Sequence, residues 1–209
     1  MGGKTANYDE SKIKTLSSLE HIRLRSGMYI GRVGDGSNQN DGIYILLKEV
    51  IDNAVDEFIM GNGTRIDIEV KDNCVKVRDY GRGIPLGKIV ECVSVINTGA
   101  KYNDEVFQFS VGLNGVGTKA VNALSSYFKV ISVREGKCAE AVFERGVLKS
   151  DKKGSVKAGV ADGTYVEFIP DTEIFGEYSF NMEFLEKRIW NYADLNAGLT
   201  RDLDALFGL

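Results

Sequence analysis

The sequence is poor in cysteine, histidine and proline, and the lack of cysteine and histidine clusters excludes metal-held and disulfide-held folds. Its 209 residues contain three cysteines, one histidine and two prolines. Cys74, Cys92 and Cys138 are too widely scattered to form a zinc site or a disulfide framework. This cysteine usage fits a protein in a reducing, cytoplasmic setting.

Long apolar runs and an excess of positive charge are also missing. The longest apolar stretches, such as residues 43–47, fall far short of the roughly 18 residues needed to cross a bilayer. The 26 lysines and arginines are outnumbered by 30 aspartates and glutamates, which gives a net charge of -4. Without a long apolar run, we expect a soluble chain that does not contact a membrane. Non-specific nucleic-acid binding needs a concentrated positive field, so we also expect that the chain does not contact DNA directly.

Glycine, in contrast, is abundant and clustered, and the apolar residues follow regular periods. A period near 3.6 over residues 43–60 predicts an amphipathic helix, and strict alternation predicts a strand at 65–71 and a second strand ending at Asp79. The other expected elements are helices at 14–25, 88–96, 118–124 and 182–195, strands at 128–134, 138–144 and 164–169, and loops at 26–31, 34–42 and 97–110. This order predicts a two-layer α/β (α+β) sandwich with a mostly antiparallel sheet.

Several polar residues stand where chemistry could take place. Glu49 and Asn53 lie one turn apart on one face of the expected helix 43–60, although such a pair is also typical of a solvated face. Asp79 has the same parity as the apolar residues before it, so its carboxylate should be at least half buried, as a turn acceptor or a ligand contact. Thr164 shares the inward parity of its own strand.

The glycine-rich loop 112–117 opens into an expected helix, where backbone N–H groups attract anions. Its Gly115-x-Gly117-x-x-Ala120 pattern matches the dinucleotide-binding fingerprint, with Glu135 at the position of a ribose-binding acid. That interpretation requires a parallel βαβ unit, whereas the strands that follow look antiparallel. A P-loop is excluded because Thr-Lys follows Gly117 in place of Lys-Ser/Thr. Competition of ATP against NAD for the site would separate the nucleotide classes.

Six short motifs follow one another along the chain: Tyr8-Asp9-x-Ser11-x-Ile13, Gly27-Met28-Tyr29-Ile30-Gly31, Glu49-Val50-Ile51-Asp52-Asn53-Ala54-x-Asp56-Glu57, Asp79-Tyr80-Gly81-Arg82-Gly83-Ile84-Pro85, Gly99-Ala100-Lys101-Tyr102 and Gly112-Leu113-Asn114-Gly115-Val116-Gly117. Together they resemble the ATPase domain of the B subunits of DNA gyrase and topoisomerase IV, the bacterial type IIA topoisomerases. The resemblance runs from about Tyr8 to Leu199. It implies the Bergerat-type (GHKL) ATP-binding fold, in which helices cover one face of a mixed, mostly antiparallel sheet.

The resemblance also implies ATP and Mg²⁺ as ligands and assigns roles to single residues. Glu49 would be the general base that polarises the attacking water, and Asn53 would hold the Mg²⁺. Asp79 would accept a hydrogen bond from the adenine amino group, with Thr164 completing that contact. The other implied ATP contacts are Tyr8, Gly83, Ile84, Pro85, Lys101, Gly112, Leu113, Asn114, Gly115, Val116, Gly117 and Thr118. Arg82 would pair with Glu57, and aminocoumarin-type inhibitors would contact Asp79, Arg82 and Arg134.

The implied organisation has three parts and several partners. Residues 1–13 would form an N-terminal arm that reaches a second copy of the chain, residues 14–199 the ATP-binding domain, and residues 200–209 a tail or the truncated start of a next domain. ATP binding would dimerise the domain and gate DNA strand passage. The topoisomerase A subunit and DNA would be contacted only through other domains. A lysine that contacts the γ-phosphate comes from a following domain in this family, so we expect the chain alone to hydrolyse ATP slowly.

The chain departs from the gyrase pattern at several positions. Gyrase-type sequences usually have histidine, tyrosine and histidine where Asn114, Phe107 and Ile45 stand. The last change removes a partner that would orient Glu49. The connection over residues 85–101 is shorter than in many gyrases, which favours topoisomerase IV. A nucleotide-gated dimerisation module like heat-shock protein 90 or MutL, without topoisomerase output, is the alternative from another functional class.

Overall fold

The structure is a computed structural model that describes residues 15–96, 98, 115–195 and 200–202 of the chain. Its strands are β1 (Arg65–Lys71), β2 (Cys74–Asp79), β3 (Ser125–Arg134), β4 (Lys137–Glu144), β5 (Val147–Ser155), β6 (Gly163–Pro170) and β7 (Thr200–Asp202). Its helices are α1 (Ser18–Leu24), α2 (Gly27–Ile30), α3 (Gly42–Ile59), α4 (Ile89–Ser94), α5 (Gly117–Ala123), α6 (Thr172–Phe175) and α7 (Met182–Leu195).

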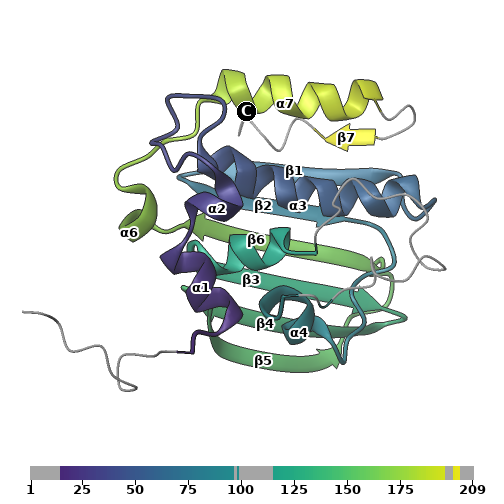
Figure 1. Ribbon diagram of the computed structural model, residues 1–209. Coiled ribbons are helices and arrows are strands. Elements are labelled where there is room, and N and C mark those ends of the chain that lie inside the picture. The colour runs from purple at the N-terminus through teal and green to yellow at the C-terminus, as the bar shows by residue number, and fades with distance from the viewer. Residues whose placement is uncertain (1–14, 97, 99–114, 196–199, 203–209) are drawn as a thin grey trace, which may run out of the picture.

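The strands form one sheet in the order β5-β4-β3-β6-β2-β1-β7. Neighbouring strands are antiparallel except β1 and β7, which pair in parallel. Helices α1, α3, α4 and α5 lie over one face of the sheet, and α7 lies beside its β1–β7 end (Figure 1). The predicted two-layer sandwich with a mixed, mostly antiparallel sheet is therefore confirmed. The dinucleotide-binding alternative fails because β3, which follows α5, pairs with both β4 and β6 in antiparallel fashion, where that alternative requires a parallel βαβ unit.

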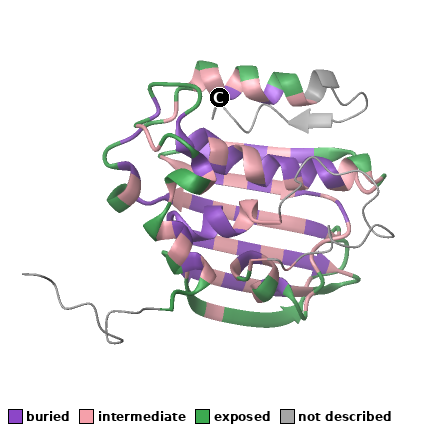
Figure 2. Ribbon diagram, viewed as in Figure 1, coloured by how far each residue is buried: buried purple, intermediate pink, exposed green. Residues whose placement is uncertain are grey.

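The buried core lies between the helices and the inward face of the sheet, and α3 is the helix that contributes most to it. Strand β2 alternates between half-buried and buried residues along its whole length, ending with the buried Asp79 (Figure 2). Strand β1 alternates in the same way, because every second side chain of a strand points to the same face. Helix α3 brings an almost continuous apolar surface against these strands. This packing fixes the rotation of α3 and thereby the direction of its polar residues.

Four elements differ from the expectation, and one of them is the short helix α6, because no helix was expected at Thr172–Phe175. The expected loop at 26–31 contains the helical turn α2, because the backbone N–H of Gly31 closes a hydrogen bond to the carbonyl of Gly27. Strand β5 was not predicted, since its sequence VLKSDKKGS has no apolar alternation and it lies exposed at the sheet edge. Residues 200–202, within the expected tail, form β7 against β1.

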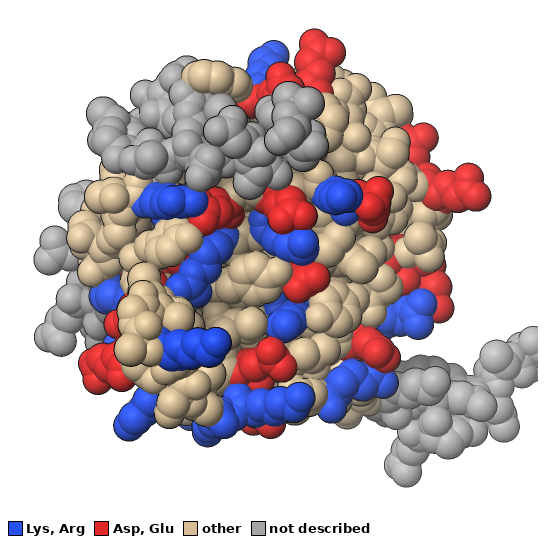
Figure 3. Space-filling view, turned by 180° about the vertical axis from the view of Figure 1, so that it is seen from behind, with Lys and Arg blue, Asp and Glu red and all other residues tan. Residues whose placement is uncertain are grey.

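The face of the sheet opposite the helices is open and carries charges of both signs (Figure 3). Lysine and carboxylate side chains pair across neighbouring strands there, as Lys76 with Glu69 at 3.0 Å and Lys129 with Glu140 at 3.5 Å. Interspersed charges are typical of a solvated sheet face. Within the described residues, no helix combines the length and apolarity that crossing a membrane requires.

Candidate functional site

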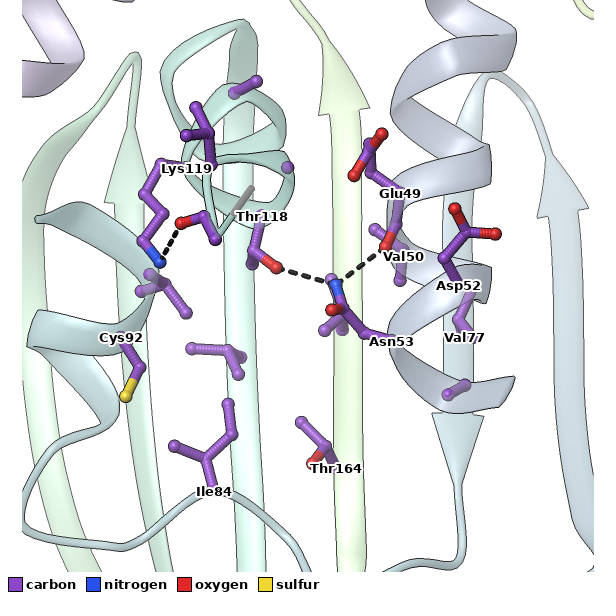
Figure 4. A pocket seen from close by; sticks show the side chains of 18 of the residues that line it. Glu49, Val50, Asp52, Asn53, Val77, Ile84, Cys92, Thr118, Lys119 and Thr164 are labelled. Atoms are coloured by element: carbon purple, nitrogen blue, oxygen red, sulfur yellow. Dashed lines mark hydrogen bonds between the residues drawn. The ribbon is translucent and has the colours of Figure 1, made fainter. Parts of the chain in front are cut away.

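A cavity of about 970 Å³ lies between α3, the start of α5 and the inward face of β2, β3 and β6 (Figure 4). The predicted site residues that line it are Glu49, Asn53, Asp79, Arg82, Gly83, Ile84, Pro85, Gly115, Val116, Gly117, Thr118, Arg134 and Thr164. The predicted residues Tyr8, Lys101, Gly112, Leu113 and Asn114 lie outside the part of the chain that the structure describes. Segments that are far apart in sequence thus converge on one space large enough for a nucleotide.

Asn53 joins the two helices on the cavity wall. Its amide nitrogen Nδ2 donates to the backbone oxygen of Glu49 at 2.7 Å and to Oγ1 of Thr118, on α5, at 2.9 Å (Figure 4). The bond to Glu49 is local to α3, whereas the bond to Thr118 crosses the cavity. Because Nδ2 makes both bonds, the orientation of the amide group is defined, with Nδ2 as its donor and the oxygen atom as its acceptor.

Glu49 lies against the first turn of α5. A Cβ atom at Gly117 would fall 1.8 Å from Oε2 of Glu49, which is far inside van der Waals contact. Only glycine therefore allows the start of α5 to approach the carboxylate this closely. The last glycine of the predicted loop 112–117 has a packing reason, in addition to the phosphate contact that the resemblance implies.

Asp79 forms part of the cavity floor at the end of β2. Its side chain is 7% exposed, and its Oδ1 accepts hydrogen bonds from the backbone N–H groups of Gly81 at 2.9 Å and Thr164 at 3.0 Å. Burial raises the pKa of Asp79 to about 6 despite these hydrogen bonds. Both bonds use Oδ1, so the second oxygen, Oδ2, can accept a hydrogen bond from a ligand in the cavity. The expected burial of this carboxylate is confirmed.

The turn after Asp79 packs closely against Glu57 of α3 and against Val133 of β3. Glu57 accepts hydrogen bonds from the backbone N–H of Arg82 at 3.0 Å and from its guanidinium at 3.0 and 2.9 Å, as expected for this pair. A Cβ at Gly81 would lie 2.7 Å from Cβ of Glu57, and one at Gly83 would lie 2.7 Å from the carbonyl oxygen of Val133. A side chain at either position would clash with a neighbouring residue, so packing inside the protein already requires both glycines.

Lys119 is a cavity residue that the sequence analysis missed. Its side chain is only 4% exposed, and its Nζ donates to the carbonyl oxygens of Thr98 at 2.6 Å and Gly115 at 2.5 Å. A buried lysine needs such partners because desolvation of its charge is costly. A lysine among the apolar residues of a short predicted helix is a signal of a buried charge, but the resemblance to the family concerned only the glycines before this helix.

The donor set of the cavity fits Mg²⁺ bound to a nucleotide better than a metal held by protein alone. Among the described residues, no group of three or more histidine, cysteine, aspartate or glutamate side chains could hold a metal ion. Mg²⁺ usually takes one or two protein oxygens and completes its shell with phosphates and water. The amide oxygen of Asn53 is a hard ligand of this kind.

Comparison with known proteins identifies the family. Residues 38–173 match the family model described as Histidine kinase-, DNA gyrase B-, and HSP90-like ATPase. The chain belongs to this ATPase family. The matched range includes α3, β2, α5 and β6, the elements that carry Glu49, Asp79, Gly117 and Thr164. The predicted ATPase fold and family are thus confirmed.

Individual relatives of this ATPase chain are topoisomerase subunits. It is 67% identical over 196 residues to the B subunit of DNA topoisomerase 4 from Borreliella burgdorferi, which covers 94% of the chain and 32% of that relative. It is 38% identical over 199 residues to the DNA gyrase B subunit of the same organism, covering 91% of the chain and 30% of that relative. The chain therefore spans about a third of the length of these curated relatives.

A solved structure shows the same fold. The 43K ATPase domain of Thermus thermophilus gyrase B, in complex with an aminocoumarin, superimposes with a TM-score of 0.73 at 33% identity. The match covers 89% of this chain and 48% of that one.

Proposed function

We propose that this chain is the ATP-binding and ATP-hydrolysing part of a type IIA topoisomerase B subunit, in which ATP-driven dimerisation gates DNA strand passage. The observation that carries the proposal is the convergence of Glu49, Asn53, Asp79 and Thr164 with residues 115–118 around one cavity. A surface role for the Glu49–Asn53 pair would leave this convergence without a reason.

In the proposed reaction, Glu49 polarises a water molecule for in-line attack on the γ-phosphate. Asn53 would hold a Mg²⁺ ion, which would supply positive charge to neutralise the phosphates. The backbone N–H groups at the start of α5 face the triphosphate, and Gly117 lets this turn approach Glu49. The barrier is lowered mainly by positioning and by charge neutralisation, so a small displacement of Glu49 should have a large effect on rate.

Adenine recognition is proposed at the opposite end of the cavity. Oδ2 of Asp79 accepts a hydrogen bond from the adenine amino group, while Oδ1 stays bonded to the backbone of Gly81 and Thr164. The Thr164 side chain completes this contact, and Ile84 and Pro85 pack on the base. Gly83, Val116 and Thr118 line the rest of the path from base to phosphates.

The same cavity is the proposed site for aminocoumarin-type inhibitors. Asp79, Arg82 and Arg134 all line it. The guanidinium of Arg134 is placed by a hydrogen bond of 2.9 Å to the carbonyl oxygen of Gly83. The related Thermus thermophilus domain was solved with an aminocoumarin.

Topoisomerase IV is the proposed parent enzyme, acting with a second copy of the chain, an A subunit and DNA bound by other domains. The identity to a topoisomerase 4 relative is 67%, against 38% to the gyrase relative of the same organism. The short connection over residues 85–101 agrees with this assignment. Supercoiling of relaxed DNA by the assembled enzyme would instead indicate gyrase.

Calorimetric titration with a non-hydrolysable ATP analogue tests the binding site. The wild-type chain should bind one analogue per monomer, and Asp79→Asn should bind it at least about tenfold more weakly. The NH2 group that takes the place of Oδ2 in this variant cannot accept the adenine hydrogen bond. Glu177→Gln, an exposed carboxylate outside the cavity, is the matched control and should bind like the wild type. Equal affinities for wild type and Asp79→Asn would refute the adenine assignment.

A second experiment separates the topoisomerase from a dimerisation module without topoisomerase output. The complete topoisomerase subunit that carries this chain, assembled with its A subunit, should decatenate or relax DNA only when ATP is present. ATP-dependent dimerisation without any change in DNA topology would support the alternative function.

A further inference from the structure

A second polar cluster, whose members Lys48 and Asp52 also line the cavity, fastens helix α3 to α7. Asp52 is buried, with 1% of its surface exposed, and its two carboxylate oxygens have different partners. The hydroxyl of Tyr192, on α7, donates a hydrogen bond to Oδ1, and Nζ of Lys48, one turn earlier on α3, pairs with Oδ2. A buried carboxylate that keeps both partners is firmly placed, since losing either would leave a charge poorly solvated.

This cluster adjoins the proposed reaction centre. Lys48 directly precedes Glu49, and Asp52 directly precedes Asn53, so the cluster and the site alternate along the same two turns of α3. Figure 4 shows Asn53 pointing toward Thr118 and Asp52 pointing to the other side of the helix. Helix α3 is thus tied to α5 through Asn53 and to α7 through Asp52.

The surroundings of Tyr192 keep its hydroxyl protonated. Burial raises the pKa of the Tyr192 hydroxyl well above its usual range, and the hydrogen bond to Asp52 and the charges of Asp52 and Glu49 raise it further. The hydroxyl therefore stays protonated and acts as a donor.

We propose that Tyr192 is a positioning residue for ATP hydrolysis, which acts through Asp52 to hold α3 in the rotation that aims Glu49 at the γ-phosphate. The inference rests on the proposed function, since it assigns Tyr192 a part in that reaction. Nucleotide affinity depends mainly on contacts made elsewhere, at Asp79, Thr164 and the start of α5. The hydroxyl of Tyr192 should therefore influence turnover far more than binding.

The variant Tyr192→Phe removes only the hydroxyl and keeps the ring. In the complete topoisomerase subunit that carries this chain, assembled with its A subunit, we expect kcat for ATP to fall about tenfold, because a displacement of the order of 1 Å at a reacting group costs up to about 100-fold. KM and the affinity for a non-hydrolysable analogue should stay within about twofold. The number of analogue sites per chain, measured by calorimetry, should remain that of the wild type.

Tyr165→Phe is the matched control. Its hydroxyl also donates to a carboxylate, Glu167, at 3.0 Å, but on the face of β6 that points away from the cavity. This variant should keep the wild-type kcat. An unchanged kcat in Tyr192→Phe would overturn the proposal, and so would a loss that is matched by an equal loss of analogue sites, because that pattern indicates unfolding.

A double-mutant cycle tests whether Tyr192 acts through Asp52. Asp52→Asn should lower kcat, and the double variant Tyr192→Phe/Asp52→Asn should be no slower than Asp52→Asn alone. Multiplicative losses would show that the tyrosine acts by another route and would overturn the inference. Failure of the proposed function gives a different result, since the wild-type protein would then neither bind the analogue nor hydrolyse ATP.

Discussion

A buried carboxylate lies near each end of strand β6, and the two carboxylates have different hydrogen-bond donors. At its start, the backbone N–H of Thr164 donates to Asp79, whose other described hydrogen bond also comes from backbone. Directly after its end, the fully buried Asp171 accepts from the guanidinium groups of Arg23 at 2.7 Å and Arg145 at 2.9 Å. No ion pair involves Asp79 among the described residues, whereas Asp171 has two.

The electrostatic consequences are opposite. Burial raises the pKa of Asp79 to about 6. Burial also acts to raise the pKa of Asp171, but the hydrogen bonds from Arg145 and Arg23 outweigh it and lower that pKa below its usual value. An ionised Asp79 therefore destabilises the empty protein at neutral pH, while an ionised Asp171 stabilises it. We interpret the first carboxylate as kept for a ligand and the second as kept for the fold.

Replacing Glu49 at the cavity tests the functional side of this contrast and should have the largest effect. In the proposed topoisomerase subunit, assembled with its proposed A subunit, Glu49→Ala should lower ATP turnover by about 100-fold or more, because the attacking water would lose the general base that we propose. The analogue affinity should change little. Glu173→Ala, at the Asp171 end, removes an exposed glutamate and should leave turnover unchanged. Normal turnover in Glu49→Ala would contradict the assignment.

Arg23→Ala tests the structural side. It removes the bonds of the guanidinium to Asp171 and to the carbonyl oxygen of Ala123 and leaves a buried charge with one cationic partner. The free energy of unfolding should fall by about 3 kcal/mol, measured by denaturant titration, without changing the analogue affinity of the folded protein. Lys88→Ala, which breaks the exposed pair with Glu91, should cost less than about 1 kcal/mol. Similar losses in both variants would remove the contrast.

Asp79→Asn should make the ligand-free protein more stable, although we expect this variant to bind ATP less well. A shift of the pKa from 3.8 to about 6 means that ionised Asp79 costs up to about 3 kcal/mol at pH 7. The amide oxygen can still accept from Gly81 and Thr164, so we expect a gain of about 2 kcal/mol in the free energy of unfolding. A destabilised variant would show that the carboxylate supports the fold.

The pH dependence of the free energy of unfolding should also distinguish the two carboxylates, although the expected changes are smaller. Because the folded pKa of Asp79 is raised, its destabilising effect disappears as the pH falls from about 6 to 4, by up to about 1.4 kcal/mol per pH unit. The advantage of Asp79→Asn over wild type should shrink accordingly. The folded pKa of Asp171 is lowered, so its stabilising contribution is lost only in more acidic solution. An advantage that stays constant between pH 7 and pH 4 would contradict the pKa of Asp79.

Local patterns predicted much of this structure. The alternation in residues 65–71 and the helical period over 43–60 identified β1 and α3, and parity alone placed Asp79 on the buried face. The pairing of Arg82 with Glu57 followed from the family resemblance. Strand β5 could not be recognised, because an exposed edge strand needs no apolar alternation and forms only where β4 offers its hydrogen bonds.

The sequence by itself determined which residues can face inward, since the periods of helix and strand are properties of the local backbone. Only the tertiary structure decided which of these residues meet. The bond between Asn53 and Thr118, the approach of Gly117 to Glu49 and the link from Tyr192 to Asp52 join segments up to 140 positions apart. Such contacts depend on how α3, α5 and α7 pack on one another, and no local pattern encodes that packing.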